Sequence, residues 1–408
     1  MGKRVICYIQ AFDCEKTIEA AMRSVLEQTY ENWICFVLSN GNQNTAAAPN
    51  WSFDIIKSFA AKDRRFVVLN KRENDLHLYI PMLYYLAGRF ADSYICLLDA
   101  DDEYQRDFFE RGVSFAQAHE LDIVACGTEI ILKKDAEEKS GVLLSRREIP
   151  QNRVIKKADF TKSFPHYKPF FNEMWGKLYR TELLRNGYDW GHAERHFYGH
   201  FLPDTLFTID TLSKSAAIGI LSGTSHKFYQ YTRRPATNAT AAVNSLVAGR
   251  QLGRRLFSNS RYSVYDTYET VLSFLRAHGE ISEELTEYMN AVLFGWFSDF
   301  YARTLLPTQD EKRFAKLAAR LIFHPKFDEV MCYQDSGKYD NLRNYEQRIK
   351  FCELLRDTLL GQIVIRNRRL LWKGNLPCSF TVRREFDQLT AKLEHMVRLL
   401  SNLQRKEE

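Results

Sequence analysis

The chain has 408 residues, of which 45% are hydrophobic and 26% charged, and its formal net charge is +6. This composition excludes disordered and collagen-like chains, and the length predicts two domains. No apolar stretch approaches the roughly eighteen residues of a membrane-spanning helix. The mild positive charge agrees with anionic substrates or a lipid surface, and no nucleic-acid partner is expected.

The eight cysteines are scattered along the chain without a Cys-x-x-Cys pair. Several of them lie inside apolar runs, which indicates buried free thiols in a reducing compartment. The first apolar run, from Val5, is broken at Gln10 and Asp13, too early for a secretory signal. We therefore expect a cytoplasmic protein, with the inner face of the membrane as an alternative location.

Apolar runs alternate with helical patterns over the first 130 residues or so. Strands are predicted at 5–10, 33–38, 65–69, 94–99, 122–126 and 128–132, and helices at about 17–28, 52–61, 79–90 and 106–118. This alternation is typical of βαβ units and a parallel sheet. The charged stretches 133–139 and 145–157 are expected to form an exposed excursion.

Helical patterns dominate after about residue 245. The domains predicted from this change are a catalytic domain at 1–240, a helical domain at 241–378 and an amphipathic helix at 379–408. The last helix carries apolar residues four and three apart, which is a heptad seam. This seam predicts a homo-oligomer, the alternative being packing on the chain's own helices; its members are Val382, Phe386, Leu389, Leu393, Met396, Leu400 and Leu403.

The most acidic point of the chain follows the strand predicted at 94–99. Tyr94-Ile-Cys-Leu-Leu runs directly into Asp99-Ala-Asp-Asp102. In parallel sheets, ligands bind beyond the carboxyl ends of the strands, where Asp99 and Asp101 would lie. Crowded carboxylates repel each other unless a cation lies between them, and hard divalent ions prefer such oxygens. The motif predicts a divalent metal or a nucleotide; an acidic cap on the next helix is the alternative.

The first 235 or so residues contain a series of motifs in a fixed order: Phe12, Ser24-Val-Leu-Glu-Gln-Thr-Tyr30, the polar loop with Gly41, Leu98-Asp-Ala-Asp-Asp102, Trp175-Gly-Lys-Leu-Tyr-Arg180 and the segment around Asp204. The order and spacing of these motifs resemble the family 2 glycosyltransferases. The resemblance implies a GT-A fold, Rossmann-like with a mostly parallel sheet and flanking helices, followed by an α-helical C-terminal region.

The resemblance implies an inverting transfer of a sugar from a nucleoside-diphosphate sugar to a hydroxyl of a glycan or lipid-linked glycan. Asp99 would face the ribose, Asp101 would bind the Mn²⁺ or Mg²⁺ that bridges the diphosphate, and Asp204 would be the general base. The remaining expected contacts are Gln10, Phe12, Ser39, Asn40, Arg72, Arg233 and Arg234 with the nucleotide, His226 with the metal, and Trp175 and Lys177 with the acceptor or sugar.

Several positions depart from the family pattern. Ser39 and Asn40 stand where acids usually read a uracil edge, so uridine is not implied. Leu83 and Tyr84 stand at the usual Arg-Asn pair, and Pro203 stands where a glutamate commonly precedes the base. These departures keep open a catalytically degraded, transferase-like scaffold.

Plainer interpretations exist for individual residues. Asp204 as a helix cap, His226 as an ordinary strand histidine and Trp175 as a core residue are the alternatives. For Arg233 and Arg234 the alternative is a solvated turn. The basic run 366–373 predicts contact with anionic lipid, or else a charged helix face.

Two other enzyme classes fit the sequence less well. A metal-dependent phosphatase of the haloacid-dehalogenase type also uses Asp-x-Asp, but on its first strand, whereas here the motif follows the fourth. A dinucleotide oxidoreductase is disfavoured because no Gly-x-Gly-x-x-Gly follows the first strand.

Overall fold

The computed structural model describes residues 2–41, 51–72, 74–75, 78–171, 173–185, 203–232, 272, 275–277, 279–333, 344–372 and 380–407. The chain divides into two compact units, Met1–Arg261 with Ala277–Gly279 and Tyr262–Arg276 with Glu280–Glu408. The domain boundaries predicted at 240 and 378 lie outside the described residues and stay predictions.

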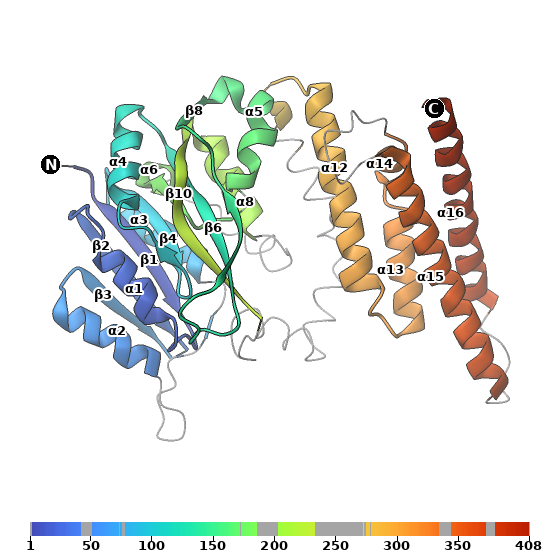
Figure 1. Ribbon diagram of the computed structural model, residues 1–408, viewed down its shortest axis with the longest axis horizontal. Helices are drawn as coiled ribbons and strands as arrows, with labels where there is room; N and C mark the ends of the chain where they lie inside the picture. Colours follow the sequence, from blue (N-terminus) through green and yellow to red (C-terminus); the bar gives the residue numbers. More distant parts are fainter. Residues whose placement is uncertain are drawn as a thin grey trace. The chain divides into compact units, whose positions relative to one another are not determined.

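A mixed sheet forms the centre of the first unit (Figure 1). Its strands are β1 Val5–Ala11, β2 Trp33–Asn40, β3 Phe66–Lys71, β4 Tyr94–Asp99, β5 Glu103–Tyr104, β6 Ile123–Lys133, β7 Val142–Arg147, β8 Arg153–Lys156, β9 Lys177–Arg180 and β10 Ala217–Tyr231. The main path is β3-β2-β1-β4-β9-β6-β10-β5, with β7 paired to β6 and β8 to β10. β3, β2, β1 and β4 are parallel, as is the β6–β10 pair, while β5, β7, β8 and β9 join antiparallel.

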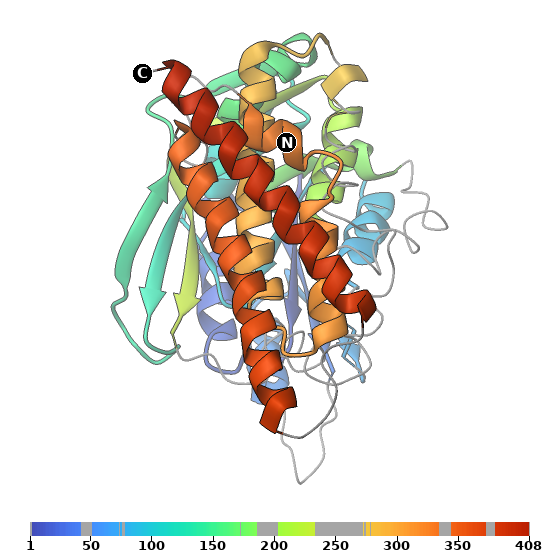
Figure 2. The same cartoon turned by 90° about the vertical axis from the view of Figure 1, so that its right-hand side faces the viewer.

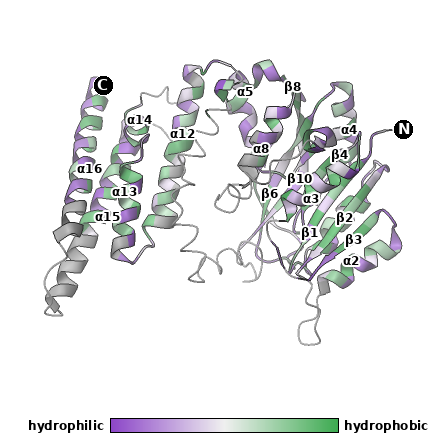
Figure 3. Ribbon diagram, turned by 180° about the vertical axis from the view of Figure 1, so that it is seen from behind, coloured by the Kyte–Doolittle hydropathy of each residue, from purple (hydrophilic) through white to green (hydrophobic). Residues whose placement is uncertain are grey.

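Helices cover both faces of the parallel half, so its strands are apolar on both sides. Alternate residues of β1, Val5, Cys7 and Ile9, belong to a core shared with α1, α2 and α4. Figure 3 shows the hydrophobic residues gathered on these strands and on one side of the helices. The helices of this unit are α1 Ile18–Leu26, α2 Trp51–Lys62, α3 Tyr79–Arg89, α4 Phe108–Ala118, η1 Lys157–Asp159, α5 Phe160–Tyr167, η2 Lys168–Phe171, α6 Thr181–Arg185 and α8 Pro203–Lys214.

The predicted strands and helices are confirmed up to residue 121, within two residues at their ends. Beyond that point two corrections are needed. The strands predicted at 122–126 and 128–132 form one strand, β6, because β10 pairs with it along its whole length. The predicted excursion is exposed but contains β7 and β8. Five of the six residues of β7 are exposed, so it lacks the alternation that reveals a half-buried strand.

The second unit is helical, as predicted. Its helix α12 begins where Ser282 Oγ accepts a hydrogen bond from Leu285 N at 3.2 Å, and α13 where Asp310 Oδ1 accepts from Arg313 N at 2.8 Å. Among the described residues, no helix is both long and apolar enough to cross a membrane. The helical elements are α12 Glu283–Phe300, the π-helical turn η3 Tyr301–Leu305, α13 Glu311–Ile322, α14 Phe327–Cys332, α15 Asn344–Trp372 and α16 Phe380–Glu407.

The heptad seam of α16 is used inside this unit. Leu389, Leu393, Met396 and Leu400 are at most 3% exposed, and α16 packs against α13, α14 and α15. Figure 2 shows α15 and α16 side by side. The seam residues Val382 and Phe386 lie outside the side chains that the structure describes. The chain's own helices therefore cover the central seam, which is the alternative that the sequence left open, and oligomerisation stays a prediction.

This packing predicts a stability effect. Leu393→Ala should lower the free energy of unfolding of the helical unit by about 2–5 kcal/mol, because it leaves a cavity at a fully buried position. Urea unfolding followed by circular dichroism measures the loss. Leu399→Ala is the matched control on the same helix, since Leu399 is 37% exposed and should change stability by less than about 1 kcal/mol. Equal effects of the two variants would contradict the packing of α16.

Candidate active site

The carboxyl ends of the parallel strands bring the predicted nucleotide residues to one edge of the sheet. Gln10 on β1 lies in register with Leu38 on β2 and with Asp99 on β4. Asn40, at the end of β2, is paired with Lys71 at the end of β3, so Arg72 follows directly beside it. Because the ends of neighbouring parallel strands meet, this edge is the place where such sheets bind ligands.

Phe12 lies against Gly41, the residue that directly follows β2. Gly41 has φ +91°, which favours glycine, and a Cβ there would lie 3.0 Å from two atoms of the Phe12 ring. The close approach of ring and backbone fixes Phe12 beside the end of β2. This position agrees with the predicted stacking of Phe12 on a base, which itself stays a prediction.

Asn40 and Gln10 hold a segment that the sequence did not single out. The Asn40 amide donates to Asn74 Oδ1 at 2.9 Å and to the Asp75 carbonyl at 3.0 Å, and its oxygen accepts from Asp75 N at 3.0 Å. Gln10 Nε2 also donates to the Asp75 carbonyl, at 3.2 Å. The side chain of the buried Asn40 therefore holds residues 74 and 75 against the end of β2.

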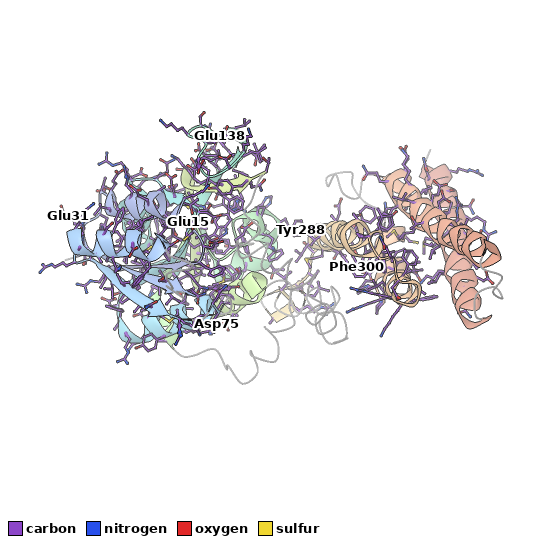
Figure 4. The ribbon with its side chains drawn as sticks, turned by 90° about the horizontal axis from the view of Figure 1, so that it is seen from below. Glu15, Glu31, Asp75, Glu138, Tyr288 and Phe300 are labelled. Atoms are coloured by element: carbon purple, nitrogen blue, oxygen red, sulfur yellow. The ribbon has the colours of Figure 1, made fainter. Side chains whose placement is uncertain are left out.

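Asp75 adds a carboxylate to this edge. It pairs with Lys71 at 3.0 Å, and its charge, after burial, raises the pKa of the Tyr8 hydroxyl. Figure 4, seen from below the view of Figure 1, labels Asp75 on the first unit. Sequence reasoning missed it because a polar loop has no periodicity; the only signal was a carboxylate a few residues after a strand.

The acidic motif forms a turn at the end of β4. Asp102 N donates to the Asp99 carbonyl at 3.1 Å, and the carboxylates of Asp99 and Asp101 are partly buried. Asp102 is only 1% exposed, and its Oδ1 accepts a hydrogen bond from Tyr229 N at 3.0 Å. The first two acids therefore remain accessible, while the third is turned toward β10.

The residues of the turn fit a divalent ion. Mg²⁺ is bound in proteins by one or two carboxylates together with substrate phosphates. The two carboxylates of this turn could supply the protein ligands of such a site. In the part of the chain that the structure describes, no group of three His, Cys, Asp or Glu side chains is placed to hold a metal. A metal at Asp99 and Asp101 would need oxygens from the ligand as well.

His226 lies in the interior beside Asp102. Its Nε2 is 3.1 Å from Asp102 Oδ2, and its ring centroid is 4.5 Å from that of Trp175 and 5.5 Å from that of Tyr104. Burial, followed by the charges of Arg147 and Lys177, lowers the pKa of His226 to about 3, so the imidazole is neutral at physiological pH. The ring is fully buried and packs among aromatic side chains, and its role as a metal ligand stays a prediction.

Trp175 and Lys177 are interior residues as well. Trp175 stacks on Phe228 with ring centroids 5.2 Å apart, and Lys177 is 1% exposed. The Lys177 ammonium donates to the carbonyls of Glu173 and Trp175, the latter at 3.0 Å. These contacts hold both side chains in the interior, and their contact with an acceptor or sugar stays a prediction.

Asp204 lies in the first turn of α8, directly after Pro203, and its side chain is outside what the structure describes. The helix itself is fixed by Tyr84, one of the departures from the family pattern. Tyr84 OH donates to Asp210 Oδ2 at 2.8 Å, and the Tyr84 ring meets Phe207 edge-on at 5.9 Å. Arg233 and Arg234 lie outside the described residues, although β10 leads directly to them.

The seven described cysteines are free, as predicted. Burial raises the pKa of Cys14 and of Cys126 to about 12, so neither thiol is a nucleophile at neutral pH.

Comparison with known proteins finds similarity to glycosyltransferases. Residues 6–184 match the model of glycosyl transferase family 2. The uncharacterized glycosyltransferase EpsJ of Bacillus subtilis (strain 168) is 26% identical over 178 residues, which are 43% of this chain and 47% of that protein. An uncharacterized glycosyltransferase of Haemophilus influenzae is 24% identical over 198 residues, 47% of this chain and 56% of that protein. The chain spans about half the length of these curated relatives.

Solved structures of S. aureus TarS 1-349 are also similar. The complex with UDP-GlcNAc has a TM-score of 0.49 and 12% identity, and covers 85% of this chain and 88% of that one. The complex with UDP has a TM-score of 0.49 and 13% identity, and covers 85% of this chain and 87% of that one.

Proposed function

We propose that this chain, whose residues 6–184 match the model of glycosyl transferase family 2, transfers a sugar from a nucleoside-diphosphate sugar to a hydroxyl acceptor. The observation that carries the proposal is the edge of the sheet where Phe12, Gly41 at the end of β2 and the Asp99–Asp102 turn come together. Relatives named as glycosyltransferases support it.

The reaction that we infer is a single displacement. Asp204 takes the proton of the acceptor hydroxyl, the hydroxyl oxygen forms a bond to the anomeric carbon, and the bond from that carbon to the diphosphate breaks. One displacement inverts the configuration at the sugar. A divalent ion, when bound, neutralises the departing diphosphate.

The chain's own residues prepare this step. Asp99 would face the ribose of the donor, Asp101 would bind the ion, and Phe12 would stack on the base. We assign the diphosphate to Arg233 and Arg234 and the nucleotide's outer edge to Arg72. A glycan or lipid-linked glycan is the proposed acceptor, with surface polysaccharide synthesis at the cytoplasmic side of the membrane as the proposed setting.

A thermal-shift screen tests the proposal. UDP, GDP, CDP and TDP sugars should each be measured with and without Mn²⁺, because a ligand that binds only the native state stabilises it. At a concentration a hundredfold above Kd the gain is about 2.7 kcal/mol, which corresponds to roughly 5–10 °C for a unit of this size. A Mn²⁺-dependent rise with one nucleotide is expected. No rise with any of the four would overturn the proposal for these donors.

A further inference from the structure

The acidic turn is attached to β10 by its third carboxylate. Asp102 Oδ1 accepts a hydrogen bond from Tyr229 N at 3.0 Å, and Oδ2 lies 3.1 Å from His226 Nε2. Both residues belong to β10, and both Asp102 and His226 are at most 1% exposed. The carboxylate of Asp102 is thus held in the interior, next to the partly buried Asp101.

The contact extends a very short strand pair. β5 has two residues, and it meets β10 only at the pairs His226↔Tyr104 and Lys227↔Glu103. Asp102 comes directly before Glu103, and its carboxylate accepts the hydrogen bond from Tyr229 N. If β5 were longer, a backbone carbonyl of β5 would accept this hydrogen bond instead. The Asp102 side chain therefore replaces a backbone carbonyl as the acceptor and extends the contact between β5 and β10 to the acidic turn.

Further bonds hold the two sides of this attachment. Asp102 N donates to the Asp99 carbonyl at 3.1 Å, so a displacement of Asp102 moves the turn. After the turn, Gln105 N donates to the Ser225 carbonyl at 2.9 Å, and Tyr104 OH donates to the Leu97 carbonyl at 2.7 Å. Asp102 is the member of this set that lies next to the accessible acids.

We propose that Asp102 is a positioning residue that holds Asp99 and Asp101 in the geometry that binds a metal and a diphosphate. The inference rests on the proposed function for its ligand, but the attachment itself does not. Two neighbouring carboxylates repel each other, so the turn needs an external hold to keep both aimed at one ion. Residues that orient metal ligands typically change metal affinity by about 10–100-fold when removed.

The first experiment titrates Mn²⁺ by calorimetry in the presence of UDP, GDP, CDP or TDP. Asp102→Ala should raise the half-saturating Mn²⁺ concentration by about 10–100-fold, and saturating Mn²⁺ should restore nucleotide binding. The half-saturating Mn²⁺ concentration of Asp102→Asn should lie between those of Asp102→Ala and the natural protein, because the amide oxygen can still accept the hydrogen bond from Tyr229 N. A natural-like Mn²⁺ dependence in Asp102→Ala would overturn the inference.

Asp122→Ala is the matched control. Asp122 is another buried carboxylate that holds β10, at its start: Oδ2 accepts from Ala216 N at 2.6 Å, and Oδ1 lies 3.1 Å from Arg180 Nη1. It precedes β6, at the opposite end of the sheet from the acidic turn. This variant should lose stability without changing the Mn²⁺ dependence. An equal shift in both variants would mean a merely structural role for Asp102.

The second experiment needs no ligand. In hydrogen exchange measured by mass spectrometry, Asp102→Ala should speed the exchange of amides at 99–102 and at Tyr229, and Asp122→Ala should not. Unchanged protection there would refute the attachment. If the natural protein binds none of the four nucleotides, the proposed function fails, while the exchange result still decides whether Asp102 holds the turn.

Discussion

Asp101→Asn should abolish the metal-dependent part of nucleoside diphosphate binding and leave the fold intact. Asp101 is partly buried in a turn, and the asparagine side chain has nearly the same size and shape as that of aspartate. It carries no charge, however, and an amide is a poor substitute for a carboxylate toward a hard divalent ion. The affinity measured by calorimetry with Mn²⁺ should fall by about 100-fold or more, beyond the effect of a residue that only orients a ligand.

The control for this result is Asp92→Asn. Asp92 is an exposed carboxylate just before β4, at the other end of the strand that leads to Asp99. It pairs only with Lys3 among the described ion pairs, at 2.6 Å, so its replacement should leave nucleotide affinity unchanged. Asp101→Asn should also differ from Asp102→Ala, because excess Mn²⁺ should not restore its binding. If Asp101→Asn keeps its affinity for nucleoside diphosphate in the presence of Mn²⁺, the assignment of the metal to this turn is wrong.

The parallel half of the sheet could be predicted because its strands are buried on both faces. Each is a short apolar run between turn residues, and runs such as Val5–Ala11 and Tyr94–Asp99 mark their own ends. Because the carboxyl ends of parallel strands meet, sheet geometry was sufficient to expect Asp99 and Asp101 at this edge. Phe12 and Asn40 were expected at the nucleotide only from the resemblance to the family.

The interior of the site could not be predicted in the same way. The bond between Asp102 and Tyr229 joins residues 127 positions apart, and that between Asn40 and Asp75 joins residues 35 apart. Lys177 and Trp175 look like cleft residues in the sequence, because charge and aromaticity suggest a surface. Only the fold shows that carbonyl groups surround the ammonium and that Phe228 covers the indole.

The departure at Tyr84 has a structural consequence for the base. A family pattern with Arg-Asn at 83–84 would place polar groups there, whereas here Leu83 is buried and Tyr84 bonds Asp210 of α8. The contact ties α3 to the helix whose first turn contains Asp204. The departure at Tyr84 therefore gives a contact between α3 and α8, and the role of Asp204 stays a prediction.

Asp204→Asn should lower turnover by about two to four orders of magnitude, the range expected for a lost general base. Asparagine fits the first turn of α8 but cannot accept the proton of the acceptor hydroxyl. The proton is transferred in the chemical step and not in donor binding, so the affinity for nucleotide and Mn²⁺ should stay nearly unchanged. A transfer assay with an identified acceptor, run beside calorimetry, separates the two quantities.

Asp210→Asn is the control on the same helix. It removes the pair with Lys214, whose Nζ lies 2.7 Å from Asp210 Oδ2, but keeps an oxygen that can accept the Tyr84 hydroxyl. Its turnover should stay within a few-fold of the natural protein, since no proton of the reaction passes through it. Near-normal turnover in Asp204→Asn would move the base to another residue, with His200 next in the sequence to be tested. A loss of nucleotide affinity that matches the loss of turnover would instead place Asp204 in donor binding.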